Sequence, residues 1–148
     1  MILNLILLIT GLTGFVTAAL VSKNHKLNST MNIYIILIII AISIRYFLLG
    51  IMNYVTDETF KSFCSRFSNF ALFIISLFYL YFKKLSDDNK TFEKKELLHL
   101  IFPISFFIII INLKFFKMNY AGMDIILYTI FVAYSLIYTF LCACLTAD

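Results

Sequence analysis

Two ionisable residues of this chain lie where ionisable side chains are rare. Arg45 is surrounded by a long apolar run, and His99 lies where a lysine-rich stretch gives way to apolar residues. A guanidinium at membrane depth costs about 3 kcal/mol on insertion scales. Arg45 is therefore predicted either to contact an anion or ligand within a bundle, or to snorkel outward or pair with a polar group. His99 shares a helix face with Glu96, and is predicted to be either a proton-responsive group or an interfacial anchor.

Three tyrosines and one proline are the other candidates. Tyr128, Tyr134 and Tyr138 fall within the last apolar run, where each buried hydroxyl requires a hydrogen-bond partner. They predict a partly polar inner face, which either lines a ligand pocket or joins helices. Pro103 removes an intrahelical hydrogen bond, so a kink or a change of helix is predicted near 98–102.

No pattern in the chain indicates catalysis or cofactor binding. The sequence has no HExxH, GxSxG, CxxC or phosphate-binding glycine loop. Cys64, Cys142 and Cys144 are read as small apolar residues, because an odd count with two histidines supports neither a disulfide framework nor a zinc site. The chain is predicted to have no catalytic site, cofactor or metal.

The composition is that of an integral membrane protein. Hydrophobic residues make up 62% of the chain, charged residues 14%, and the mean hydropathy is +0.97; soluble domains are roughly 45–50% apolar. The apolar residues form long runs separated by short polar breaks. The predicted fold class is therefore all-α, a polytopic helical membrane protein whose 148 residues form a single domain.

Five apolar segments approach the roughly 20 residues that cross a bilayer as a helix. Their predicted bounds are 2–21, 33–55, 67–82, 98–116 and 125–145, with a cytoplasmic loop at about 83–97. The first segment lacks a basic n-region and is longer than a usual signal-peptide core, so it is predicted to be a retained helix. Gly11 and Gly14, with Thr10, Thr13 and Thr17, give it a small-residue face, which is predicted to pack within the chain in preference to forming a dimer.

The distribution of basic residues predicts the orientation. Lysines after the first segment and in the loop at 83–97 number seven, against four basic residues on the opposite side. Because cytoplasmic loops are enriched in Lys and Arg, the N-terminus is predicted outside and the C-terminus inside a bacterial inner membrane. The net charge of +4 is thus attributed to topology and contact with anionic lipid, and no nucleic-acid contact is predicted.

The segment from Tyr79 to Pro103 resembles a known family. Its Tyr-Leu-Tyr-Phe-Lys-Lys-Leu run, a short charged loop, and Phe-Glu-Lys-Lys-Glu-Leu-Leu-His-Leu-Ile-Phe-Pro are similar to the N-terminal multi-spanning membrane region of AraC-family transcription regulators of the Bacteroidetes. That resemblance implies a sensor-type region followed by cytoplasmic helix-turn-helix units. No such units are present here, so the resemblance implies a truncated form.

The sequence thus leads to three hypotheses about function. The first is a non-enzymatic sensor-type membrane domain that lacks its DNA-binding output. The second is a small stand-alone transporter or accessory subunit that uses Arg45 and the polar face of the last apolar segment as a pathway, and the third is a structural membrane protein without a ligand. The predicted partner is the lipid bilayer, and a small-molecule signal and a second copy of the chain remain open. The reading frame downstream of Asp148 would separate the first hypothesis from the others.

Overall fold

A computed structural model describes residues 2–24, 30–86, 91–115 and 123–147, and this part of the chain is a bundle of helices without a strand. The α-helices are α1 (Ile2–Asn24), α2 (Thr30–Met52), α3 (Glu58–Phe67), α4 (Leu72–Ser86), α5 (Leu98–Phe115) and α6 (Met123–Ala147). Two 3₁₀ segments, η1 (Ser68–Ala71) and η2 (Lys94–Leu97), precede α4 and α5. The all-α prediction is therefore confirmed.

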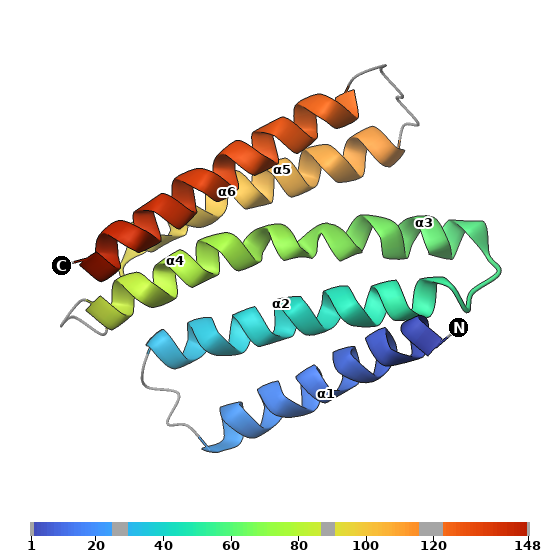
Figure 1. Cartoon of the computed structure of the whole chain (residues 1–148), viewed down its shortest axis with the longest axis horizontal. Helices are drawn as coiled ribbons and strands as arrows, with labels where there is room; N and C mark the ends of the chain where they lie inside the picture. The colour runs from blue at the N-terminus through green and yellow to red at the C-terminus, as the bar shows by residue number, and fades with distance from the viewer. Residues whose placement is uncertain (1, 25–29, 87–90, 116–122, 148) are drawn as a thin grey trace.

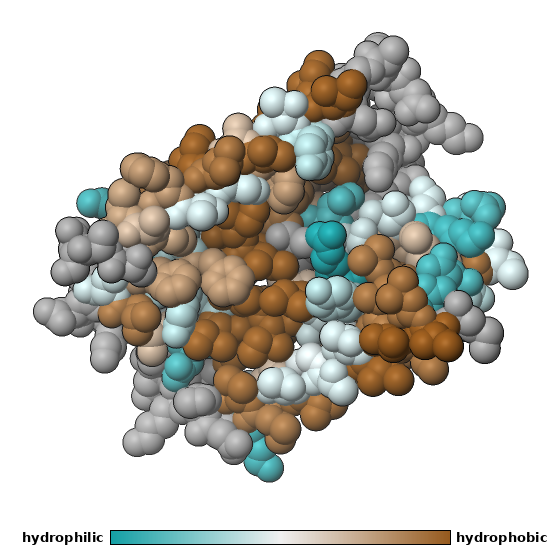
Figure 2. Space-filling view, viewed as in Figure 1, coloured by the Kyte–Doolittle hydropathy of each residue, from teal (hydrophilic) through white to brown (hydrophobic). Residues whose placement is uncertain are grey.

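Four helical stretches are long and apolar enough to cross a membrane. They are Ile2–Lys23, Thr30–Met52, Lys94–Asn112 and Ile125–Leu145. Few residues of these windows are buried within the chain, and Figure 2 shows apolar residues over most of the viewed face. Because such a surface is stable in lipid and unfavourable in water, the bundle is compatible with a membrane location.

The third predicted span differs most from the structure. In place of one helix at 67–82, α3, η1 and α4 follow one another as a nearly straight rod, 10, 4 and 15 residues long (Figure 1). The 15 residues of α4 alone are fewer than the roughly 20 that span a bilayer, so five spans is an approximate count. The sequence analysis missed α3, although Phe60, Phe63 and Phe67 have helical spacing and their rings contact one another in series.

Other boundaries shift by a few residues. Asp57 caps α3, since its carboxylate accepts hydrogen bonds from the Thr59 amide at 2.9 Å and from the Thr59 hydroxyl. The α4 helix continues to Ser86 and η2 begins at Lys94, so the predicted loop at 83–97 is shorter than expected. The predicted end of the fourth span at Phe116 lies outside the described residues, as do Lys26, Lys90 and Lys117, which entered the orientation count.

Helix α2 is packed on two opposite sides, by α1 and by the α3–α4 rod (Figure 1). On the α1 side the helices approach closely. A Cβ atom built on Gly11 would lie 2.6 Å from the backbone nitrogen of Phe47. A Cβ atom built on Gly50 would lie 2.6 Å from the backbone nitrogen of Leu8. A Cβ on Gly14 would collide with the Ser43 hydroxyl. The two glycines of the first helix therefore pack within the chain, as the sequence predicts, whereas Thr10, Thr13 and Thr17 of the predicted face are exposed.

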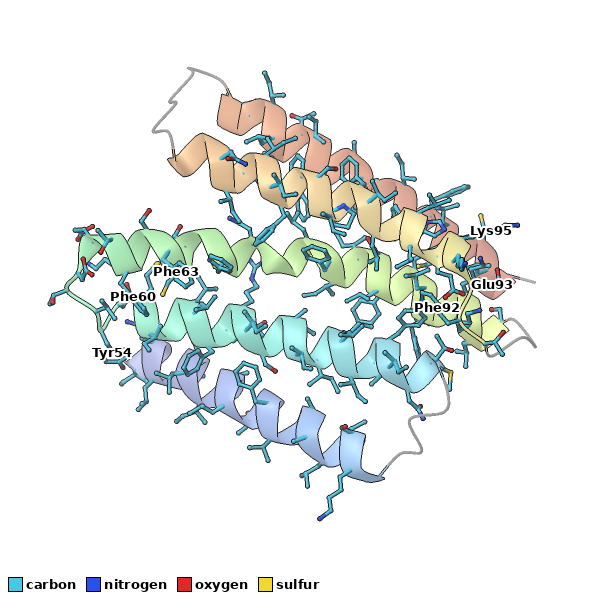
Figure 3. All side chains as sticks on the ribbon, turned by 180° about the vertical axis from the view of Figure 1, so that it is seen from behind. Tyr54, Phe60, Phe63, Phe92, Glu93 and Lys95 are labelled. Atoms are coloured by element: carbon cyan, nitrogen blue, oxygen red, sulfur yellow. The ribbon has the colours of Figure 1, made fainter. Side chains whose placement is uncertain are left out.

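The opposite side of α2 forms the apolar core with α4. Tyr34 and Ile38 pack there against Leu77 and Leu80, and all four are at least 95% buried. The outer helices then cover α4, since both α5 and α6 make contacts with it. Aromatic side chains mark the two ends of the bundle: Tyr54, Phe60 and Phe63 lie at one end and Phe92 at the other (Figure 3). Exposed aromatic rings at both ends are typical of the two membrane interfaces.

Candidate functional site

A buried ion pair joins three elements at the lysine-rich end of the bundle. The Lys84 ammonium on α4 lies 2.5 Å from the Glu96 Oε1 atom on η2, and each side chain is 1% exposed. The Tyr34 hydroxyl on α2 donates a hydrogen bond to Glu96 Oε2. Lys84 also donates to the Thr91 carbonyl oxygen at 2.7 Å. We call Tyr34, Lys84 and Glu96 the buried triad.

The triad holds residues 91–96, which lead into α5, against the end of α4. Lys84 contacts both Thr91 and Glu96, so one side chain holds two points of the segment that leads into α5. Among the described residues, none forms a hydrogen bond of ordinary geometry with Glu96 Oε1. The ion pair with Lys84 therefore compensates for the burial of that oxygen. A buried pair of this kind is weak evidence for net stability, but losing one partner is costly because the other charge is left unpaired. The triad therefore makes the positions of α2, α4 and η2 depend on one another.

A second polar network crosses the bundle one turn further into α5. His99 Nδ1 on α5 lies 3.0 Å from the Tyr138 hydroxyl on α6. The rings of Tyr138 and Tyr134 pack against one another with their centroids 4.6 Å apart, and the Tyr134 hydroxyl is hydrogen-bonded to that of Ser76 on α4. Ser76 is fully buried and Tyr134 is 6% exposed. We call His99, Tyr138, Tyr134 and Ser76 the hydroxyl chain.

Aromatic packing surrounds the hydroxyl chain. The Tyr79 ring lies 4.9 Å from the ring of His99 and 5.3 Å from that of Tyr138, while Phe102 stacks on Tyr134 at 4.3 Å. Hydroxyl and imidazole groups held in apolar surroundings keep the same partners, because water is not there to replace them. The chain can therefore act as a specific connection among α4, α5 and α6.

A shallow groove of about 400 Å³ opens beside the hydroxyl chain. Its walls are almost entirely apolar and come from α5 and α6; they are formed by Phe102, Ile130, Ala133, Tyr134, Ile137 and Tyr138. The volume falls within the roughly 300–1,000 Å³ of small-molecule sites. Apolar walls with a few polar groups at one edge are the common arrangement of such sites.

The structure unites some of the predicted residues and separates others. Tyr134 and Tyr138 face inward and their hydroxyls have partners, whereas Tyr128 is 69% exposed. At 3.6 residues per turn, Tyr128 lies about 120° round the helix from Tyr134. The prediction of an inner position is thus wrong for Tyr128, and helical geometry alone could have shown it.

His99 and Pro103 are both found near the start of α5. The predicted contact of His99 with Glu96 is replaced by its contacts with Tyr138 and Tyr79, and Glu96 influences His99 only electrostatically. Pro103 is buried inside α5, which continues past it. The change from η2 to α5 falls at Leu98, within the predicted region, while the kink stays a prediction.

Arg45 lies on the side of α2 that faces the rod. Its position continues the helical stripe of Tyr34, Ile38 and Ala41, yet those three are buried and Arg45 is exposed. No ion pair or hydrogen bond links its side chain to another described residue. The antiparallel pairing of α2 with the rod puts Arg45 near the level of η1, where the rod changes helix type.

The sequence analysis missed Tyr34, Ser76, Lys84 and Glu96 as site residues. Lys84 falls within the loop predicted at 83–97, but it is buried. The spacing of Leu77, Leu80 and Lys84 places all three on one helix face, which was the available signal. The pairing with Glu96 could not be found in this way, because Glu96 belongs to another element and helix periodicity does not predict contacts between elements.

The described residues form no cluster of side chains suited to binding a metal ion. Among the described residues, no three His, Cys, Asp or Glu side chains are close enough together to hold a metal ion. The described cysteines are free thiols, with Cys64 buried and Cys144 exposed.

Comparison with protein families, curated proteins and solved structures gives no match for this chain. The class that the fold defines is a helical protein with four helical stretches long and apolar enough to span a membrane. The resemblance of residues 79–103 to AraC-family membrane regions stays a prediction.

Proposed function

We propose that this chain is a non-enzymatic sensor-type membrane domain, in which movement of α5 and α6 is passed to the lysine-rich end of the bundle. The observation that carries the proposal is the buried triad, which ties α2, α4 and the entry to α5 together through two charges with almost no exposure. The resemblance of residues 79–103 to membrane-bound AraC-like regulators is consistent with this role.

The proposed mechanism uses the two polar networks in series. The hydroxyl chain connects α6 to α4 and to α5, and the triad connects α4 and η2 to α2. A shift of α5 would move Glu96 relative to Lys84, because only Leu97 and Leu98 separate Glu96 from His99. Since half of a buried ion pair is strongly unfavourable, the triad favours two discrete arrangements, formed or broken, over a continuous range.

The orientation completes the proposal. With the triad end in the cytoplasm, as the lysine distribution indicates, α6 would end on the side where a DNA-binding partner or domain could respond. An inner-membrane location with the N-terminus outside belongs to this proposal.

Distance measurements in nanodiscs test whether the triad controls the arrangement. Spin labels are placed at the exposed Cys144 on α6 and at Lys23→Cys on α1, with Cys64 and Cys142 replaced by Ala. Removing both charges with Lys84→Met and Glu96→Gln is expected to shift the label-to-label distance distribution. An unchanged distribution, with helical content retained, would show that the triad holds no arrangement and would defeat the proposal.

A second candidate, a small transporter or accessory subunit, is favoured by one observation. Arg45 is an exposed cation on the rod-facing side of α2, near the level at which the rod is interrupted by η1. Helices interrupted at mid-depth, with polar groups beside them, form the substrate sites of many transporters. Uptake of a labelled anion into proteoliposomes, abolished by Arg45→Gln and retained by Lys61→Gln, would establish this candidate; absence of uptake would remove it.

A further inference from the structure

The groove between α5 and α6 has an apolar body and a polar end. From Ile130 to Tyr138 the α6 residues of the groove extend along roughly 12 Å of helix, on one face. Tyr138 and Tyr134 are the groove residues that bear hydroxyls, and both belong to the hydroxyl chain. The occupant should therefore be a long apolar group with a polar group at its Tyr138 end.

The charges near Tyr138 favour an anion. His99 Nδ1 lies 3.0 Å from the Tyr138 hydroxyl. Lys83 follows Tyr79 by one turn on the same face of α4, and the Tyr79 ring packs against both His99 and Tyr138. Lys83 forms no ion pair with any residue that the structure describes. Glu96 acts on His99 electrostatically, but its charge is compensated by Lys84. The polar end thus offers a cation, an imidazole and a phenol, and these donors suit a carboxylate.

We infer that the groove binds one free long-chain fatty acid, with its acyl chain along α6 and its carboxylate at Lys83, His99 and Tyr138. The acyl chain enters from the surrounding lipid, since the groove opens on the outer surface of the bundle. The carboxylate lies toward the end of the bundle where α4 and α6 finish, which is the end with the lysines of residues 83–97. This orientation keeps the charge at the interface and the chain in the hydrocarbon.

Binding of such a ligand would act on the residues that link the two networks. A carboxylate at Tyr138 and His99 competes for the donors of the hydroxyl chain, and His99 is three residues from Glu96 of the triad. The role of the fatty acid as a signal rests on the proposed sensor function, whereas its binding does not.

The test measures equilibrium binding of palmitate to the full chain in phosphatidylcholine nanodiscs. Methyl palmitate has the same chain without the charge, and is expected to bind at least about tenfold more weakly, because hydrogen bonds to a charged group are lost. This comparison needs no variant. Equal affinity of the acid and the ester would show partition into lipid alone, and would overturn the inference.

Matched variants separate the groove from the surface. Ala133→Phe fills the groove and should weaken palmitate binding at least about tenfold, while Ala19→Phe, on the exposed face of α1, should leave it unchanged. Lys83→Gln should weaken binding of palmitate several-fold and leave binding of methyl palmitate unchanged. Lys94→Gln, at an exposed position, should change the binding of neither ligand. Palmitate binding that is insensitive to both Ala133→Phe and Lys83→Gln, in folded protein, would also overturn the site.

The spin-label distance between Cys144 and position 23 distinguishes the two proposals. Palmitate that binds at the groove without changing this distance supports the site and refutes its sensor role. Absence of palmitate binding, in a protein whose distance still depends on the triad, refutes the site and leaves the proposed function standing.

Discussion

Replacing Lys84 by Met should be among the most damaging single changes at the lysine-rich end of this bundle. Lys84 and Glu96 are each 1% exposed, and their charged atoms lie 2.5 Å apart. The methionine fills much of the lysine volume, so the packing loss is small. What remains is a buried carboxylate that has lost its cation.

The size of the effect follows from that geometry. Removing one partner of a buried ion pair typically costs about 3–5 kcal/mol. Tyr34 still donates one hydrogen bond to Glu96 Oε2, which places the expected loss near the lower limit, about 3 kcal/mol. Tyr34→Phe alone should cost less, about 1.5–3 kcal/mol, because the ion pair persists.

The double variant isolates the charge pair. Lys84→Met combined with Glu96→Gln removes both charges, and buried ion pairs replaced as a unit are often nearly neutral. The double variant should therefore be more stable than Lys84→Met alone by about 2 kcal/mol or more. Lys94→Met, at the same end but exposed, should change stability by less than about 0.5 kcal/mol.

Reversible unfolding in mixed micelles, followed by far-ultraviolet circular dichroism, gives these free energies. A loss below about 1 kcal/mol for Lys84→Met would mean that water reaches Glu96 and that the pair behaves as a surface pair. An additive double-mutant cycle would likewise refute the reasoning, since independent residues show no coupling free energy.

Other regions give further predictions. Gly11→Val should destabilise the protein by about 1–3 kcal/mol, because the added side chain forces α1 away from the α2 backbone. Ala19→Val, on the exposed face of α1, should not destabilise it. The unfolding assay described above measures both variants. Tyr134→Phe leaves the fully buried Ser76 hydroxyl without its tyrosine partner and should lower the free energy of unfolding by about 1–3 kcal/mol. Tyr128→Phe, at a 69% exposed position, should leave stability unchanged. Equal effects of the two variants would contradict the inward position of Tyr134 and the outward position of Tyr128. Hydrogen bonds from the Thr59 side chain and amide hold the pKa of Asp57 below its usual value, so its capping contribution is present above the unfolded-state pKa and is lost as pH falls through the folded-state pKa. The protection factors of amides 58–67, which are ratios of the intrinsic to the observed exchange rate at the same pH, should therefore fall in acid, and Asp57→Asn should remove much of that pH dependence.

Part of the candidate site could be predicted from residue types alone. Tyr134 and Tyr138 were expected on a polar inner face, and the structure gives both hydroxyls partners. Their partners could not be predicted, because Ser76 and His99 belong to other helices. The sequence left open whether Arg45 contacts a ligand within the bundle or reaches outward, and the structure shows it exposed although the adjoining stripe of α2 is buried.

The sequence by itself determined the class of protein and most of its helices. Hydrophobicity is a local property, so runs of about 20 apolar residues define α1, α2, α5 and α6 whatever their neighbours are. The glycines of α1 likewise predict close packing. Only the tertiary structure decided that Lys84 and Glu96 form a buried pair and that α3 continues into α4. Such contacts depend on the path of the chain between helices, and no local pattern of residue types records that path.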